Sequence, residues 1–336
     1  MKRLIPLIAL AAVSTVPATA FAWGGMGHRL IGLATARALP EEIPAFLRTK
    51  QAIEDQGELA IEPDHSKSSG KEHDLEMQSA HFIDIDENGK VLGGPPSANL
   101  PATRDLYEKL LVPFGLNSWQ VGYLPYTIFD RWQVLAKDFA TYRVLAAAQA
   151  NPKWKAHRAF YAADMRRRQA LILAHVGELQ HYVGDGSQPL HTTSHFNGWG
   201  NGPNPNGYTM AKIHAPFEGE FVAHNLTLAL VEAGMTPLSV CNCAIEGEAL
   251  RYLNLGATKV APLYQLEKDG ALKDGDARMI AFTAERLAAG ASETRDLIVG
   301  AWRASTDFVV GYKPVKVADV LSGKTDPYDA LMNQGE

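Results

Sequence analysis

Two short segments of this 336-residue chain each place a histidine and a carboxylate four residues apart. His181 and Asp185 form the first pair, and His214 and Glu218 form the second. Residues four apart on a helix project from the same face, and imidazole and carboxylate groups are common zinc ligands. A single pair of this kind is more often a helix ion pair or a cap, but two such pairs favour a metal site.

The segment between the two pairs supports this interpretation. Gly186 and Pro189 should end the first helix, so that His191 returns over its end. Pro216 suits the first turn of the helix that carries the second pair. A further histidine between two potential ligand pairs favours metal binding over two separate ion pairs.

The first 22 residues predict export. Residues 1–3 are Met-Lys-Arg, residues 4–16 are apolar, and residues 20–22 read Ala-Phe-Ala. A charged start, a short apolar run and a small-x-small site describe a secretory signal peptide, and the run is too short for a stable membrane anchor. We therefore expect cleavage between Ala22 and Trp23, a secreted or periplasmic protein, and no transmembrane segment.

The predicted mature chain begins at a residue that can bind a metal. Its first six residues are Trp-Gly-Gly-Met-Gly-His, so the free α-amine of Trp23 lies five residues before His28. An α-amine and the carbonyl oxygen of the same residue can chelate a metal ion in a five-membered ring, and a nearby imidazole adds a third ligand. Trp23 and His28 are therefore candidate ligands.

These motifs resemble those of an enzyme superfamily. The pattern Trp-Gly-x-x-Gly-His at residues 23–28 resembles the start of the secreted single-strand-specific zinc nucleases. Residues 181–191 resemble the His-x-x-x-Asp-x-x-x-x-x-His signature of the superfamily, which also contains zinc-dependent phospholipase C. The resemblance covers roughly residues 23–225. It implies a single all-α domain with long loops around a cleft that holds three Zn²⁺ ions.

The resemblance also implies which residues would hold these ions. Asp64 is assigned because it lies seventeen residues before His81, close to the separation in the family, and Asp74 is the competing candidate. The implied sets are Asp64, His81, His181 and Asp185 for one zinc; Trp23, His28 and a bridging oxygen of Asp185 for its close neighbour; and His191, His214 and Glu218 for the third.

Such a site would hydrolyse phosphate esters. The paired zincs would lower the pKa of a shared water toward neutrality, and the resulting hydroxide would attack phosphorus in line. Asp185 would hold the metal pair together, and Asp64 could take a proton while it binds zinc. Asp64 and Asp185 are therefore the predicted catalytic residues.

The two branches of this superfamily act on different substrates, and features of the chain resemble both. The N-terminal motif and the spacing of twenty-three positions from His191 to His214 resemble the nucleases. Three features favour phospholipase C: Glu218 in place of Asp, the sequence of residues 214–222, and the absence of the nuclease pattern Trp-Ala-Asp-x-x-Arg around Asp64, where Lys67 takes the position of the arginine. We favour a phospholipase C that acts on phospholipid head groups. The alternative is a single-strand-specific endonuclease or 3'-nucleotidase.

Three residues are predicted to bind the substrate. Lys67 would contact a phosphate as a point charge. Phe82 and Phe196 could stack on bases or surround a choline ammonium, so aromatic content does not separate a phospholipid from a single-stranded nucleic acid.

His195 could contact a zinc-binding histidine or lie on the loop surface.

Net charge limits how an anionic substrate is held. The chain has 32 Lys and Arg against 37 Asp and Glu, and loss of Lys2 and Arg3 with the signal peptide would leave a net charge of −7. A surface of this charge would not gather polyanions by bulk electrostatics. An anionic substrate must therefore be held locally, as metal ions can do.

The two cysteines, Cys241 and Cys243, occur as Cys-Asn-Cys. A disulfide framework needs more cysteines, and a bridge across one residue would be strained. Two zinc thiolates would have no His or Cys partner nearby in the sequence. We therefore favour an ordinary surface loop over both alternatives.

Hydrophobic periodicity predicts a helical protein. Polar segments rich in Gly, Pro and Ser or Asn are expected as loops at residues 58–101 and 186–211. The catalytic domain should cover residues 23–312, followed by a tail of uncertain order at residues 313–336. Helices are expected at residues 30–39, 121–150, 153–183, 216–233, 246–267 and within 276–309.

Overall fold

The computed structural model describes residues 23–200 and 202–332, so the predicted signal peptide at residues 1–22 lies outside the described residues. Helices make up 67% of the chain and strands 3%, which confirms the predicted all-α class. The α-helices are α1 (Gly25–Arg37), α2 (Lys50–Leu59), α3 (Glu62–His65), α4 (Lys71–Gln78), α5 (Arg104–Leu111), α6 (Ser118–Val121), α7 (Leu124–Ala150), α8 (Arg158–Ser187), α9 (Val222–Asn225), α10 (Leu228–Gly234), α11 (Ile245–Ala257), α12 (Val260–Lys268), α13 (Ala277–Ala304), α14 (Val317–Leu321) and α15 (Tyr328–Met332).

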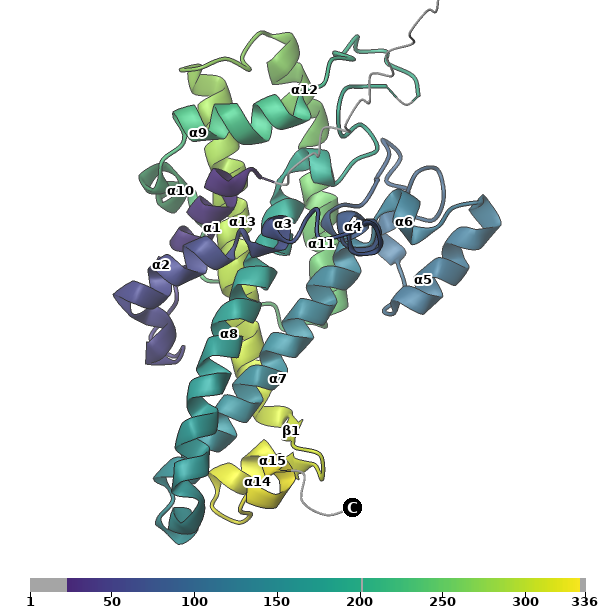
Figure 1. Cartoon of the computed structure of the whole chain (residues 1–336). Coiled ribbons are helices and arrows are strands. Elements are labelled where there is room, and N and C mark those ends of the chain that lie inside the picture. Colours follow the sequence, from purple (N-terminus) through teal and green to yellow (C-terminus); the bar gives the residue numbers. More distant parts are fainter. Residues whose placement is uncertain (1–22, 201, 333–336) are drawn as a thin grey trace, which may run out of the picture.

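Three long helices, α7, α8 and α13, form the scaffold (Figure 1). Pro125 lies in the first turn of α7, where its missing N–H costs no hydrogen bond. Asp276 caps α13 by accepting a hydrogen bond from the backbone N–H of Arg278. Phe139, Val176 and Ile298, one from each helix, are fully buried in the main hydrophobic cluster. Burial of this apolar surface is the main stabilising contribution.

Close backbone packing attaches α2 to this scaffold. A Cβ atom added to Gly177 of α8 would lie 2.5 Å from the Cβ of Leu59, at the end of α2. A Cβ atom added to Gly32 of α1 would lie 2.7 Å from the carbonyl oxygen of Gln56. Only glycine leaves room for these approaches, which bring the chain after α2 against the C-terminal half of α8.

Two expected helices are interrupted. The region 216–233 consists of a π-helical turn η7 (Pro216–Phe221), α9 and α10. Leu226 is extended, and the Thr227 hydroxyl then accepts a hydrogen bond from the N–H of Leu230 to cap α10. The region 246–267 is divided into α11 and α12. Apolar periodicity continues across both breaks, so it did not reveal them.

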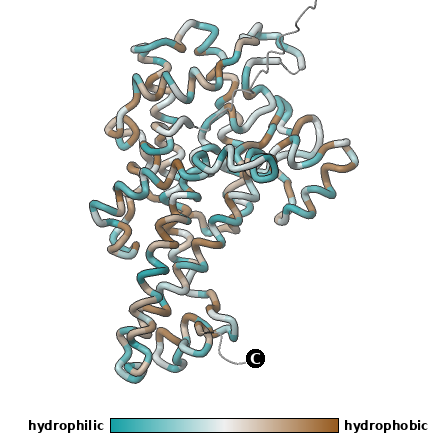
Figure 2. Tube along the Cα trace, in the orientation of Figure 1, coloured by the Kyte–Doolittle hydropathy of each residue, from teal (hydrophilic) through white to brown (hydrophobic). Residues whose placement is uncertain are grey.

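The polar segment 58–101 is more ordered than a simple loop. It contains α3, α4, and the 3₁₀ turns η2 (Ser79–His81) and η3 (Ser97–Asn99). None of the α4 residues is buried, and Figure 2 shows this helix as hydrophilic. The absence of an apolar face explains why periodicity did not predict α4.

The segment after α13 packs on the scaffold. Strand β1 (Val309–Val310) pairs antiparallel with β2 (Val315–Lys316). Val317 and Val320 of α14 are buried in a cluster with residues of α7. Residues 313–332, predicted as a tail of uncertain order, thus form α14, α15 and part of a small sheet near one end of α7 and α8 (Figure 1). Within the described residues, no helix is long and apolar enough to cross a membrane.

A disulfide joins Cys241 and Cys243. The prediction of an ordinary loop at this position was therefore wrong. The two Cα atoms are 5.3 Å apart, which lies within the range that a disulfide can span. One intervening residue is therefore enough for Cys241 and Cys243 to form a disulfide, although their spacing in the sequence argued against it.

Candidate metal centre

The C-terminal end of α8 carries His181 and Asp185, both fully buried. Four-residue spacing places them on one face, as expected. Nδ1 of His181 lies 2.9 Å from the carbonyl oxygen of Ala60. A proton on Nδ1 satisfies that carbonyl and leaves the Nε2 lone pair available as a ligand. The close approach of α2 to α8 therefore orients this imidazole.

His81 and Asp64 bring two more donors to the same place. Nδ1 of His81 lies 2.9 Å from Oδ2 of Asp185 and 3.0 Å from Nε2 of His181. Oδ1 of Asp64 lies 3.8 Å from Nε2 of His181. Potential ligand atoms of Asp64, His81 and His181 all lie within 4.8 Å of one another. His81 ends the 3₁₀ turn η2, and Phe82, which follows it, has an extended backbone.

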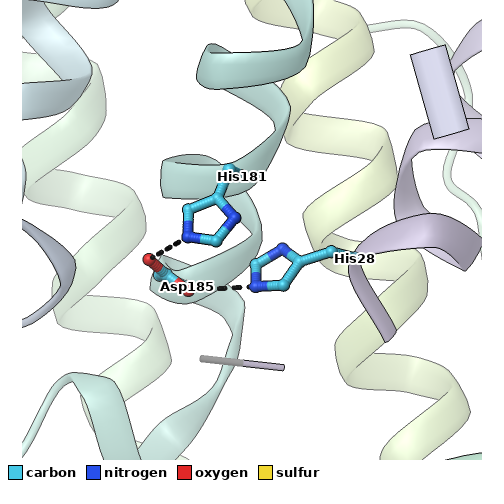
Figure 3. A group of neighbouring side chains, drawn as sticks. All are labelled: His28, His181 and Asp185. Carbon is cyan, nitrogen blue, oxygen red and sulfur yellow. Dashed lines mark ion pairs between the residues drawn. The ribbon is translucent and has the colours of Figure 1, made fainter. Parts of the chain in front are cut away.

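His28 approaches Asp185 from α1 (Figure 3). Its Nε2 lies 3.4 Å from Oδ1 of Asp185, whereas Nε2 of His181 lies 3.5 Å from Oδ2. The rings of His28 and His181 stack with their centroids 3.9 Å apart. The two oxygens of one carboxylate therefore face different histidines, as a carboxylate that bridges two metal ions must do.

Trp23 lies between the elements that carry the two ligand pairs. Its indole is fully buried and donates a hydrogen bond of 2.8 Å to the Ser187 hydroxyl at the end of α8. The N–H of Gly24 donates to the carbonyl oxygen of Glu218 at 3.3 Å. The predicted mature N-terminus is thus packed against both α8 and η7.

A third donor set forms where the loop after α8 meets η7. Nε2 of His214 lies 2.8 Å from Oε2 of Glu218 and 3.1 Å from Nε2 of His191. Nδ1 of His191 lies 2.7 Å from the carbonyl oxygen of His81, which again leaves Nε2 as the ligand atom. Glu218 lies in the π-helical turn. Such turns are frequent at functional sites because they redirect side chains.

Several donor atoms at this centre make no hydrogen bond. Both ring nitrogens of His28, Nε2 of His81 and Oε1 of Glu218 are buried and make no hydrogen bond to any described residue. Buried polar atoms are rarely left in this state. Bound cations would satisfy them, and sets of imidazole and carboxylate donors suit Zn²⁺. The residues present therefore fit the predicted zinc ions.

Burial also determines the protonation of these groups. It lowers the pKa of His181 and of His214 to about 4, so both imidazoles are neutral near pH 7 and able to bind metal. Burial raises the pKa of Glu218 to about 7 and that of Asp185 well above its ordinary value. Nearby cations would reverse these increases by stabilising the carboxylates.

A cavity of about 210 Å³ opens beside the donor atoms. All three residues predicted to bind substrate line it: Lys67, Phe82 and Phe196. Lys67 forms an ion pair with Asp64, and Phe196 is 45% exposed. Besides these three residues, the cavity is lined by His81, His191, His214, Leu190, Gln78, Asp84 and Gln120.

Two polar residues of this cavity were not predicted. Asp84 lies three residues after His81, and burial raises the pKa of its carboxyl group to about 7. Its position in His-Phe-Ile-Asp was a usable signal. Gln120 lies in α6 and lines the cavity. The side chain of Asn117 caps this helix by accepting a hydrogen bond from the backbone N–H of Gln120. Nothing local in the sequence connects this residue with the metal centre.

The structure also places Asp74 and His195, the two residues for which the sequence left alternatives open. Oδ1 of Asp74 accepts a hydrogen bond from the N–H of Ser68 at 2.9 Å, and Asp74 belongs to none of the donor sets among the described residues. Its position therefore favours Asp64. His195 is buried, stacks on Trp199 with ring centroids 3.9 Å apart, and lies 2.8 Å from a carboxylate oxygen of Glu87. It packs within the loop that follows His191.

Comparisons with protein-family models, curated proteins and solved structures find no match to this chain.

Proposed function

We propose that this protein is an exported, zinc-dependent hydrolase of phosphate esters. The convergence of three donor sets carries the proposal: His181 belongs to two of them, and the two oxygens of Asp185 approach His28 of one set and His81 of the other. The donors adjoin a cavity that also contains a lysine and two phenylalanines. Three Zn²⁺ ions, when bound, would supply Lewis acidity and make a water molecule acidic near neutral pH.

Three side chains around this centre would have separate roles in the reaction. Asp185 would connect two neighbouring donor sets, because its two oxygens face different histidines. Asp64 is a buried carboxylate at the edge of the centre and would accept a proton from the attacking water. Lys67, already beside Asp64, would bind a non-bridging phosphate oxygen.

The cavity favours a phospholipid head group as substrate. A choline ammonium is a cation, and aromatic faces together with a carboxylate attract such a group. Phe82, Phe196 and Asp84 supply this combination along one cavity. The same two phenylalanines would stack on the base of a single-stranded nucleic acid in the alternative function, but Asp84 offers that polyanion no attraction.

Parallel assays of a phosphatidylcholine analogue and single-stranded DNA test this proposal. We expect zinc-dependent hydrolysis of the phosphatidylcholine analogue, and replacement of Asp84 by asparagine should raise the KM for this substrate more than it lowers kcat. A preference for DNA would assign the nuclease function instead. The broader proposal would be wrong if the zinc-loaded protein hydrolysed neither substrate nor a simple phosphodiester.

A further inference from the structure

Outside the metal centre, the disulfide lies beside the start of α11. Both cysteines are exposed, and α11 begins two residues after Cys243. Sγ of Cys243 lies 3.8 Å from Oε2 of Glu248, in the first turn of this helix. Potential ligand atoms of Cys241, Cys243 and Glu248 all lie within 4.8 Å of one another.

A second carboxylate borders the same place from α13. Glu293 lines a small cavity together with both cysteines and Glu248. Its side chain is only 11% exposed, and its Oε1 atom is buried without a hydrogen-bond partner among the described residues. Buried polar atoms are rarely left without a partner, and a bound cation would satisfy this one.

We propose that reduction of the disulfide between Cys241 and Cys243 creates a site for one soft or borderline divalent cation, such as Zn²⁺ or Cd²⁺. The ligands would be the two thiolates with Glu248 and Glu293. Thiolate sulfur selects soft and borderline cations over Mg²⁺ or Ca²⁺, and four donors suit a tetrahedral ion. This site is separate from the histidine-rich centre and does not depend on its function.

The local charges favour a metal site over a reactive dithiol. Catalytic thiolates lie in electropositive surroundings, whereas Sγ of Cys243 here contacts the carboxylate of Glu248, and Glu293 lines the same cavity as both cysteines. Arg251 now connects these carboxylates, with Nη2 2.5 Å from Glu248 and 3.3 Å from Glu293. Its side chain is 50% exposed and can turn to solvent when a divalent cation takes its place.

The reductive step balances with a phosphine as the reductant. The disulfide accepts two electrons and two protons and becomes two thiols, while the phosphine becomes a phosphine oxide with oxygen from water. Each thiol then releases its proton when it binds the cation. A phosphine is preferable to a dithiol in the experiment because a dithiol would itself bind the metal.

Cd²⁺ uptake by the zinc-loaded protein tests the proposal. Before reduction, the protein should bind no thiolate-coordinated Cd²⁺. After reduction by the phosphine, it should bind one additional equivalent, with the ultraviolet charge-transfer absorption of cadmium thiolates. The reduced double variant C241S/C243S should lose this absorption, and Glu293→Gln should weaken the added binding by about tenfold or more.

Glu246→Gln provides the matched control. Glu246 lies in the same first turn of α11 but lines a different cavity, with Arg104, so its replacement should leave the added Cd²⁺ binding unchanged. Equal uptake before and after reduction would overturn the proposal. So would charge-transfer absorption that persists in the cysteine variant, or loss of helical circular dichroism on reduction.

Discussion

The two oxygens of Asp185 face different histidines, with Oδ1 3.4 Å from His28 and Oδ2 2.9 Å from His81. Glu218 is placed differently, because one of its oxygens approaches both His191 and His214. Asp185 should therefore affect two metal ions and Glu218 only one. This difference at the scale of single residues makes the two carboxylates separable by mutation.

Replacement of Asp185 by asparagine should disturb two zinc ions and lower turnover by more than about 100-fold, beyond the usual effect of losing an outer hydrogen-bond partner. Glu218→Asp keeps a carboxylate ligand and should retain substantial activity. Turnover and zinc content, measured on both variants, provide the comparison. Near-normal turnover of Asp185→Asn with three zinc ions bound would contradict the bridging role.

His175 provides a residue-scale prediction away from the metal centre. Its Nδ1 lies 2.5 Å from Oδ2 of Asp138, and this hydrogen bond raises the pKa of His175 above its ordinary value of 6.5. A raised pKa in the folded state stabilises the protein below the unfolded pKa, and this contribution disappears as pH rises through the folded value. The wild type should thus lose more stability than His175→Gln as the pH rises from below 6.5 through the raised pKa of His175.

Urea unfolding at each pH measures this difference. The zinc-dependent part of the pH effect is common to both proteins and cancels in the comparison. His224→Gln is the control, because His224 pairs with Asp274 at the surface with its side chain 61% exposed, where such pairs contribute little. An equal pH dependence for the wild type and His175→Gln would contradict the prediction.

At the scale of elements, three segments distant in sequence are joined around the end of α8. The chain after α2 orients His181 through the carbonyl of Ala60. The N-terminal segment before α1 packs its tryptophan against Ser187, and η7 accepts a backbone hydrogen bond from Gly24. The position of each donor set therefore depends on how these elements are anchored to α8.

A protein with one extra methionine before Trp23 tests the proposed role of the N-terminus. The added residue would convert the α-amine into an amide, which is a poor ligand, next to a fully buried indole. We expect loss of most activity and a lower zinc content. The control carries the same methionine with a protease site that restores Trp23 as the first residue. Full activity and zinc content before processing would rule out Trp23 as a ligand.

At the scale of the whole molecule, the donor sets connect two regions whose buried apolar side chains form separate hydrophobic clusters. One buried cluster contains Trp23, residues of α1 and Phe217 of η7, whereas the largest cluster lies along α7, α8 and α11. The candidate metal centre lies where these regions meet, and its donor residues come from both. Bound zinc should therefore cross-link the fold as well as support hydrolysis.

Removal of zinc by a chelator should lower the melting temperature by many degrees, because ligands that bind only the native state stabilise it by mass action. The same treatment should abolish hydrolysis, and added Zn²⁺ should restore both. Scanning calorimetry and elemental analysis measure the effects. Fewer than two zinc ions in a fully active protein would contradict the trinuclear proposal.

Local patterns in the sequence predicted much of the fold and of the candidate site. The helical class and the long helices α7, α8 and α13 follow from periodicity. Four-residue spacing placed His181 and Asp185 on one helix face, because helix geometry alone decides which residues share a face. The breaks after Asn225 and Ala257 were not predicted, because the apolar pattern continues across them.

The sequence by itself determined the types of candidate donor residue and their local spacing, since these depend on residue identity and helical repeat. Only the tertiary structure decided which carboxylate joins His81, because Asp64 and Asp74 differ in long-range packing rather than in local pattern. It also brought Gln120 to the cavity and Glu293 to the cysteines. These contacts join segments far apart in the chain, and their formation depends on how buried surfaces fit together.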